Sequence, residues 1–209
     1  MGSPCAISIQ SADPAPVRGE DGDNMANTAR MVARALVAGA ILAGPRVSAH
    51  AEETVPNLAT TSHVRSFSPS IASVMQQAGE RSATFRRLVE TIDASDSYVY
   101  VDEGECRDSD QRACLVNVTV GGRFRFIFVH VAARTADWDL MGSIGHELRH
   151  AIEVIDNRFV TSLLTMRSLY GRIGKQNSQD PHSYETAAAV TAGNAVRDEV
   201  RAFIRRAKP

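Results

Sequence analysis

The sequence has no large excess of charge of either sign, no internal repeat and no long low-complexity tract. Lysine and arginine total 23 and aspartate and glutamate total 24, which leaves a net charge of −1 over 209 residues. Such a balance does not favour nucleic acid or an acidic membrane surface as a partner. With 44% hydrophobic and 22% charged residues, the composition predicts one globular domain plus a non-globular segment.

The most apolar stretch near the N-terminus is too short to span a bilayer. The run Ala35–Gly44 has ten residues, whereas a transmembrane helix needs about 20. Arg30 and Arg34 precede this run, and the small residues of Ala49-His50-Ala51 follow it. Together these features predict a secretory signal peptide over residues 25–51, cleaved near Ala51, with export to the periplasm or beyond the cell. The alternatives are an uncleaved anchor and a buried helix.

The segments on either side of this signal peptide are polar. Residues 1–24 are rich in Ser, Pro, Asp and Gly and have no hydrophobic periodicity, so we predict a disordered extension. Residues 52–68 form a Thr- and Ser-rich flexible lead-in, which could be a propeptide. The globular domain is therefore predicted over residues 69–206.

Cysteine is scarce, with three residues in the chain. Cys5 lies in the segment that we expect to be removed. Cys106 and Cys114 remain, separated by polar, loop-like residues. An even pair across a short loop indicates a disulfide in an oxidising compartment, which agrees with export. Two free thiols are the alternative, and the spacing is not usual for a pair of zinc ligands.

Hydrophobic periodicity predicts an α+β fold. Two helices should begin near Ser68 and Ser82. Three strands should follow, the last two joined as a hairpin by Gly121-Gly122. Three more helices complete the order, at about 137–156, 160–173 and 184–206. We therefore expect a small antiparallel three-stranded sheet packed on helices.

The chemistry is concentrated in His146-Glu147-Leu148-Arg149-His150, which has the pattern HExxH. Residues i and i+4 lie on the same helix face, so both imidazoles can bind one Zn²⁺. Glu147 is turned by about 100° around the helix axis. Its carboxylate can then reach a zinc-activated water as a general base. Alternatively, these histidines and charged residues bind no metal and are ordinary surface or core residues.

A catalytic zinc usually has three protein ligands. Glu153 shares the histidine face but lies about 10.5 Å along the axis from His146, so it is better placed to support a ligand or form an ion pair. Asp156 lies ten residues after His146, where the metzincin pattern has its third ligand. However, that pattern needs a glycine turn at the position that Glu153 occupies. Glu185 is the best candidate. We expect it to begin the last helix, where the small residues Ala188, Ala189, Ala192 and Ala195 on the same face would allow two helices to approach closely. Alternatively, Glu185 complements a helix N-terminus.

These residues resemble a known family. HExxH with a downstream Glu185 resembles the gluzincin branch of the zincin metallopeptidases. Residues 82–89, the strand at 96–101, GHELRHAIEV and Tyr184-Glu185-Thr186 look like a group of small exported, uncharacterised bacterial proteins. The resemblance covers about residues 68–206 and implies a minimal zincin-like core. It also implies that His146, His150 and Glu185 are the zinc ligands and that Glu147 is the general base.

The function expected from these features is zinc-dependent hydrolysis of peptide bonds. The expected partner is a peptide or protein substrate, without nucleic acid and without a membrane span once the signal peptide is cleaved. Tyr170, His182, Tyr184 and Arg149 lie near the motif, but nothing selects one to stabilise the oxyanion. The alternative function is an exported, non-catalytic, zinc-stabilised binding module. The sequence does not indicate an oligomeric state.

Overall fold

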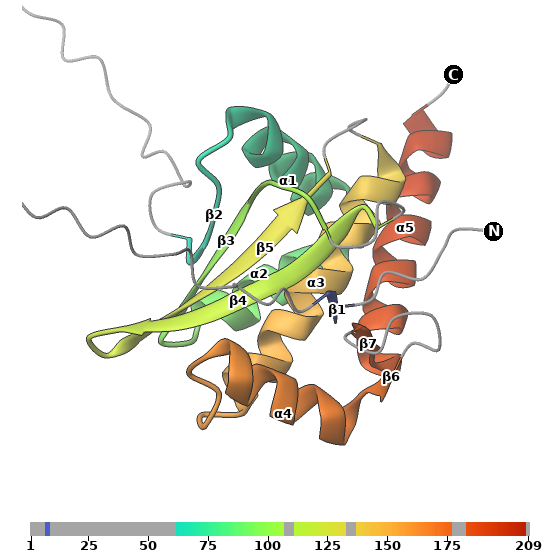
Figure 1. Cartoon of the computed structure of the whole chain (residues 1–209). Coiled ribbons are helices and arrows are strands. Elements are labelled where there is room, and N and C mark those ends of the chain that lie inside the picture. The colour runs from blue at the N-terminus through green and yellow to red at the C-terminus, as the bar shows by residue number, and fades with distance from the viewer. Residues whose placement is uncertain (1–6, 9–61, 107–110, 133–136, 177–182, 208–209) are drawn as a thin grey trace, which may run out of the picture. The chain divides into compact units, whose positions relative to one another are not determined.

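The computed structural model confirms the α+β class (Figure 1). It describes residues 7–8, 62–106, 111–132, 137–176 and 183–207. The predicted signal peptide and its cleavage site lie outside these ranges, as does Cys5. Two parts of the predicted N-terminal segments are described: Ile7–Ser8 forms strand β1, and Val64–Arg65 in the predicted lead-in forms strand β2.

Within the described ranges there are five helices, and their caps follow the sequence. Ser82 caps the second helix by accepting a hydrogen bond from the Phe85 N–H, and Asp137 does the same for the Leu140 N–H of the third. Side-chain oxygens at this position satisfy backbone donors that the first turn leaves unpaired. The helices are α1 (Pro69–Arg81), α2 (Ala83–Asp93), α3 (Trp138–Asp156), α4 (Leu163–Ile173) and α5 (Ala187–Ala207).

The main sheet differs from the prediction. It is a four-stranded mixed sheet in the order β2-β3-β5-β4, and the expected three-stranded antiparallel sheet is wrong. Strand β3 (Ser97–Glu103) pairs in parallel with both β2 and β5 (Phe124–Val131). Only β4 (Ala113–Gly121) runs antiparallel to its neighbour. Alternation along a strand shows which face it buries but not which strand lies beside it, so the order had to come from the tertiary structure.

The predicted hairpin is confirmed. β4 and β5 pair from Ala113↔Val131 to Gly121↔Phe124, with a register shift between Leu115 and Asn117. The two-residue turn is Gly122-Arg123, one position later than predicted. Gly122 has a φ of 61°, which a two-residue hairpin turn commonly requires and which glycine adopts without strain.

The sheet has two different faces. Val99, Val101, Ile127 and Val129 are buried in the main core, which they share with the apolar sides of the helices. The aromatic residues at alternate positions of β3 and β5 lie on the opposite face and are only partly buried. Helix α3 contacts both the sheet and α5 (Figure 1), which places the HExxH segment in the interior.

The predicted disulfide is confirmed. Cys106 and Cys114 are bonded, with their Cα atoms 5.9 Å apart. The bond ties the segment after β3 to the first residues of β4. It is compatible with an oxidising compartment.

A second, smaller sheet has the order β1-β7-β6. Strand β7 (Ser183–Glu185) pairs antiparallel with β6 (Lys175–Gln176) on one side and with β1 on the other. This sheet immediately precedes α5, so it determines where the chain enters that helix. None of the helices in the described part of the chain has the length and apolar character that a bilayer crossing requires.

Candidate metal centre

Helix α3 carries the HExxH segment through the interior of the domain. Its apolar residues Ile144 and Leu148 are fully buried in the core. The polar residues beside them are buried too, with exposed fractions of 2% for His146, 0% for Glu147 and 0% for His150. Buried ionisable groups require partners or a metal ion to compensate for lost hydration. This burial weakens the interpretation of the three residues as ordinary surface groups.

Helix α5 lies very close to the histidine side of α3 because both helices have glycine at the contact. A Cβ built on Gly193 would lie 2.9 Å from the Cβ of His146, and one built on Gly145 would lie 2.8 Å from Val196. Any side chain at these positions would push the helices apart. The close packing brings the start of α5, and the strand before it, up to the HExxH segment. The alanine stripe contributes in part: Ala189 and Ala192 are buried, whereas Ala188 is exposed.

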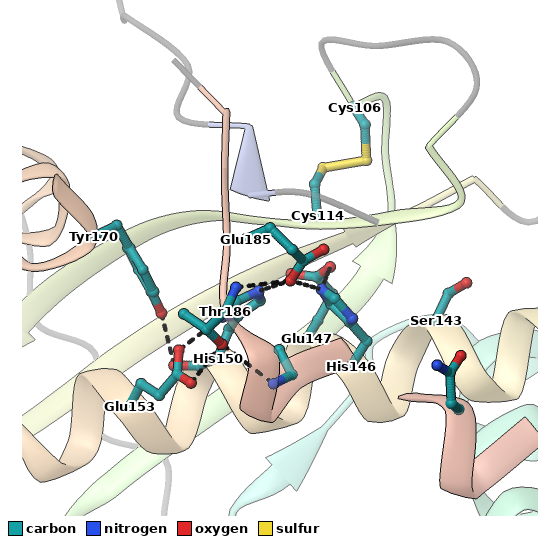
Figure 2. Close-up of polar contacts among 12 residues, drawn as sticks. Cys106, Cys114, Ser143, His146, Glu147, His150, Glu153, Tyr170, Glu185 and Thr186 are labelled. Atoms are coloured by element: carbon teal, nitrogen blue, oxygen red, sulfur yellow. Dashed lines mark hydrogen bonds and ion pairs between the residues drawn. A yellow bond between two sulfur atoms is a disulfide. The ribbon is translucent and has the colours of Figure 1, made fainter. Parts of the chain in front are cut away.

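Figure 2 shows that His146, His150 and Glu185 point toward one another. Glu185 Oε1 lies 3.3 Å from His146 Nε2 and 3.6 Å from His150 Nε2. One potential ligand atom from each residue lies within 4.8 Å of the other two, so the group could hold a metal ion. Ligands about 2.0–2.1 Å from a tetrahedral ion are separated by about 3.3 Å. The distances from Glu185 Oε1 to the two Nε2 atoms are close to that value.

Several buried atoms of this group have no hydrogen-bond partner. They are His146 Nε2, His150 Nε2 and Glu185 Oε2. Buried polar atoms are rarely left unpaired in folded proteins. Here the two unpaired Nε2 atoms both lie near Glu185 Oε1, and imidazole nitrogen with carboxylate oxygen is a donor set that suits a divalent metal. The residues present therefore fit a metal ion.

The other ring nitrogen of each histidine is held in place. His150 Nδ1 lies 2.8 Å from Glu153 Oε2, and His146 has a hydrogen bond to the Ala189 backbone. Such contacts orient metal-binding histidines and select the tautomer with a free Nε2. Glu153 was expected to support a ligand or form an ion pair, and its contact with His150 agrees with this. Its second oxygen accepts a hydrogen bond from Thr186 Oγ1 at 2.7 Å.

The electrostatics of the two histidines differ strongly. Burial, together with the positive charges of His150 and Arg197, lowers the pKa of His146 to about 2. Burial also opposes a charge on His150, but the contacts with Glu153 and Glu185 and the charge of Glu147 outweigh it and raise the pKa to about 9. Carboxylates therefore stabilise a positive charge at this point, and a divalent cation would take the place of the His150 proton.

Glu147 is fully buried, and burial raises its pKa to about 7. The charge of Glu185 acts in the same direction, whereas His150 and the Leu115 backbone oppose it. A carboxyl group with a pKa near neutrality can both accept and return a proton at neutral pH. Glu147 lies beside the histidines and outside the candidate ligand group, which is the position that its helical angle predicts.

The structure brings together all four residues singled out in the sequence. One element differs, because Glu185 ends strand β7 and does not begin the last helix. Its Oε1 nevertheless accepts a hydrogen bond from the Thr186 N–H just before α5, so the alternative role at a helix N-terminus is present as well. Asp156 is exposed and outside the group.

Among the residues considered for stabilising an oxyanion, Tyr170 already uses its hydroxyl in another hydrogen bond. Its hydroxyl donates a 2.9 Å hydrogen bond to the His150 carbonyl, and its ring packs edge-on against His150. Burial raises its pKa well above the ordinary value. Tyr184 and Arg149 are partly buried, and His182 lies outside the described residues. The sequence did not single out Thr186, which contacts Glu153 at the candidate metal centre. A threonine at the start of a helix is typical of a cap and does not by itself indicate a site.

In comparisons with known proteins, the chain matches no protein-family model, no curated protein and no solved structure. The functional argument therefore depends on the geometry of the site and on the residues that form it.

Proposed function

We propose that the protein is a zinc-dependent metallopeptidase in which His146, His150 and Glu185 hold the ion and Glu147 is the general base. The observation that carries the proposal is the convergence of both imidazole Nε2 atoms on one Glu185 oxygen, at 3.3 and 3.6 Å. The resemblance of HExxH and Glu185 to the gluzincin pattern supports the same assignment.

The donor set favours zinc over magnesium and calcium. Two imidazoles and one carboxylate form the three-ligand set of catalytic zinc sites that keep a fourth position for water. Magnesium and calcium prefer oxygen ligands throughout. When bound, the ion would supply a water of lowered pKa and would polarise a substrate carbonyl.

The contribution of Glu147 follows from its position and its protonation. The side chain lies 3.9 Å from His146 Nε2, close enough to reach a water beside the ligand group. Its ionised carboxylate would accept a proton as the water oxygen adds to the amide carbon. The same group, now protonated, would deliver that proton to the leaving nitrogen as the carbon–nitrogen bond breaks. A pKa near 7 suits both transfers.

A second candidate is supported by the burial of the site. The side chains of His150 and Glu147 are completely buried, and only Glu185 is partly exposed, at 20%. A closed site suits a structural zinc, which stabilises the folded state without turnover. The protein would then be an exported, zinc-stabilised binding module. Export itself is part of the proposal, and it is based on the predicted signal peptide and on the disulfide.

Metal analysis of the purified protein beside His150→Ala and Glu185→Ala tests the ligand set. We expect one zinc per chain in the wild type and loss of zinc from both variants. Retention of zinc by Glu185→Ala would reject Glu185 as a ligand. A Glu147→Gln variant then separates the two functions, because it should keep zinc but lose hydrolysis of a peptide library. Zinc without hydrolysis in the wild type would establish the binding module instead.

A further inference from the structure

Strand β1 lies at the candidate metal centre although it comes from the far N-terminal end of the chain. Ile7 pairs with Tyr184 and Ser8 with Ser183, so the partner strand is the one that ends in Glu185. Because β6 occupies the other edge of β7, β1 takes the edge that would otherwise be free. An extended segment of polypeptide is therefore seated one residue away from a candidate metal ligand.

This segment also contacts the larger sheet. β1 also contacts β4, the edge strand of that sheet, and lies between β4 and β7 (Figure 1). β4 also contacts the HExxH helix α3. β1 therefore contacts both the strand that ends in Glu185 and a strand that packs against the HExxH helix.

We propose that β7 and β4 form a slot that binds an extended peptide main chain beside the metal centre, and that residues 7–8 occupy it in the full-length chain. Pairing along β7 uses main-chain donors and acceptors, so the occupant is recognised as an extended backbone and not by a particular side chain. The role of the slot in presenting a substrate depends on the proposed peptidase function, whereas its occupation by β1 does not.

This arrangement makes the N-terminal segment an intramolecular competitor of any peptide that binds there. A free peptide must therefore reach a concentration comparable with the effective concentration of the tethered segment in order to displace it. Cleavage near Ala51, where the signal-peptide pattern ends, would separate residues 7–8 from the domain and free the β7 edge.

The test uses the full-length chain carrying Glu147→Gln, so that a bound peptide is not cleaved. In an antiparallel ladder, hydrogen-bonded and non-hydrogen-bonded residue pairs alternate, so only one residue of β1 donates its N–H to β7. Replacing both, as Ile7→Pro together with Ser8→Pro, removes that N–H in either case. We expect the amides among residues 183–185 that point toward β1 to exchange about tenfold faster in this variant, whereas those that point toward β6 keep their protection. A synthetic peptide with the sequence of residues 6–11, added at millimolar concentration, should restore the protection.

Ala26→Pro together with Asn27→Pro is the matched control, because it places the same change elsewhere in the N-terminal segment. This control should leave exchange at 183–185 unchanged, and the same peptide with proline at positions 7 and 8 should not protect. Unchanged exchange in the Ile7→Pro, Ser8→Pro variant, or faster exchange that the peptide does not slow, would overturn the proposal. The peptidase function is tested separately by hydrolysis in the wild type, so the two can fail independently.

Discussion

Glu153 accepts a 2.7 Å hydrogen bond from the hydroxyl of Thr186, which joins the second half of α3 to the residue that precedes α5 (Figure 2). The other Glu153 oxygen lies 2.8 Å from His150 Nδ1. Thr186 directly follows Glu185. The buried carboxylate of Glu153 therefore positions His150 on α3 and also the backbone next to Glu185 on β7. Thr186 Oγ1 also accepts the Ala189 N–H, which fixes the first turn of α5.

The first prediction concerns this hydrogen bond. Thr186→Val keeps the shape of the side chain but removes the hydroxyl, so Glu153 loses a partner and Glu185 loses a constraint. We expect metal affinity to fall by about 10- to 100-fold, the usual effect of removing a contact that orients a ligand. Competitive titration with a chromogenic chelator measures it. Thr186→Ser should restore the affinity, and equal affinity in Thr186→Val would show that the hydrogen bond does not organise the site.

The second prediction concerns the close approach of α3 and α5. Gly193→Ala would place a Cβ 2.9 Å from His146 Cβ and 3.1 Å from the Gly142 carbonyl oxygen. We expect the free energy of unfolding to fall by about 1–3 kcal/mol, because the helices must separate, and metal affinity should fall with it. Urea denaturation and the same metal titration provide the measurements.

Gly171→Ala is the control for that substitution. Gly171 lies in α4, and a Cβ there meets nothing within 4 Å. The change should therefore raise the free energy of unfolding by about 0.5–1 kcal/mol through helix propensity alone. A similar loss of stability in both variants would mean that the effect at Gly193 is not one of helix packing.

The third prediction is a pH dependence that arises away from the metal centre. Burial opposes ionisation of Glu199, but hydrogen bonds from Ser82 and Thr84 outweigh it and hold the pKa below its usual value of 4.5. Ionised Glu199 therefore stabilises the folded state. This stabilisation is present above pH 4.5 and is lost as the pH falls through the lowered pKa. Urea midpoints between pH 7 and pH 3 should fall less steeply in Glu199→Gln. The exposed Glu90→Gln should keep the wild-type profile.

The fourth prediction concerns the disulfide, tested in a Cys5→Ser background so that no other thiol can exchange. Replacing Cys106 and Cys114 by alanine should lower the free energy of unfolding by about 2–3 kcal/mol, because the short loop is no longer closed in the unfolded chain. Thermal melts with and without reductant provide the comparison. Reductant should lower the melting temperature of the bonded protein and leave the alanine variant unchanged; a shift in both would point to another cause.

The sequence by itself determined the local features. The spacing of His146 and His150 places them on one face of a helix because the α-helix repeats every 3.6 residues. Ser82 caps a helix at the predicted start, and a glycine at Gly122 allows the hairpin. The polar spacing of the two cysteines was sufficient to predict their bond. Each of these depends on residues near one another in the chain.

The tertiary structure decided what depends on distant segments meeting. The order β2-β3-β5-β4 follows from packing and not from the alternation within any strand. Glu185 joins the histidines because α5 can lie against glycines of α3, and its place on β7 depends on pairing with β6 and β1. The pKa of Glu147 rises because the folded core excludes water from it. Long-range contacts and burial are properties of the folded chain, so no local pattern encodes them directly.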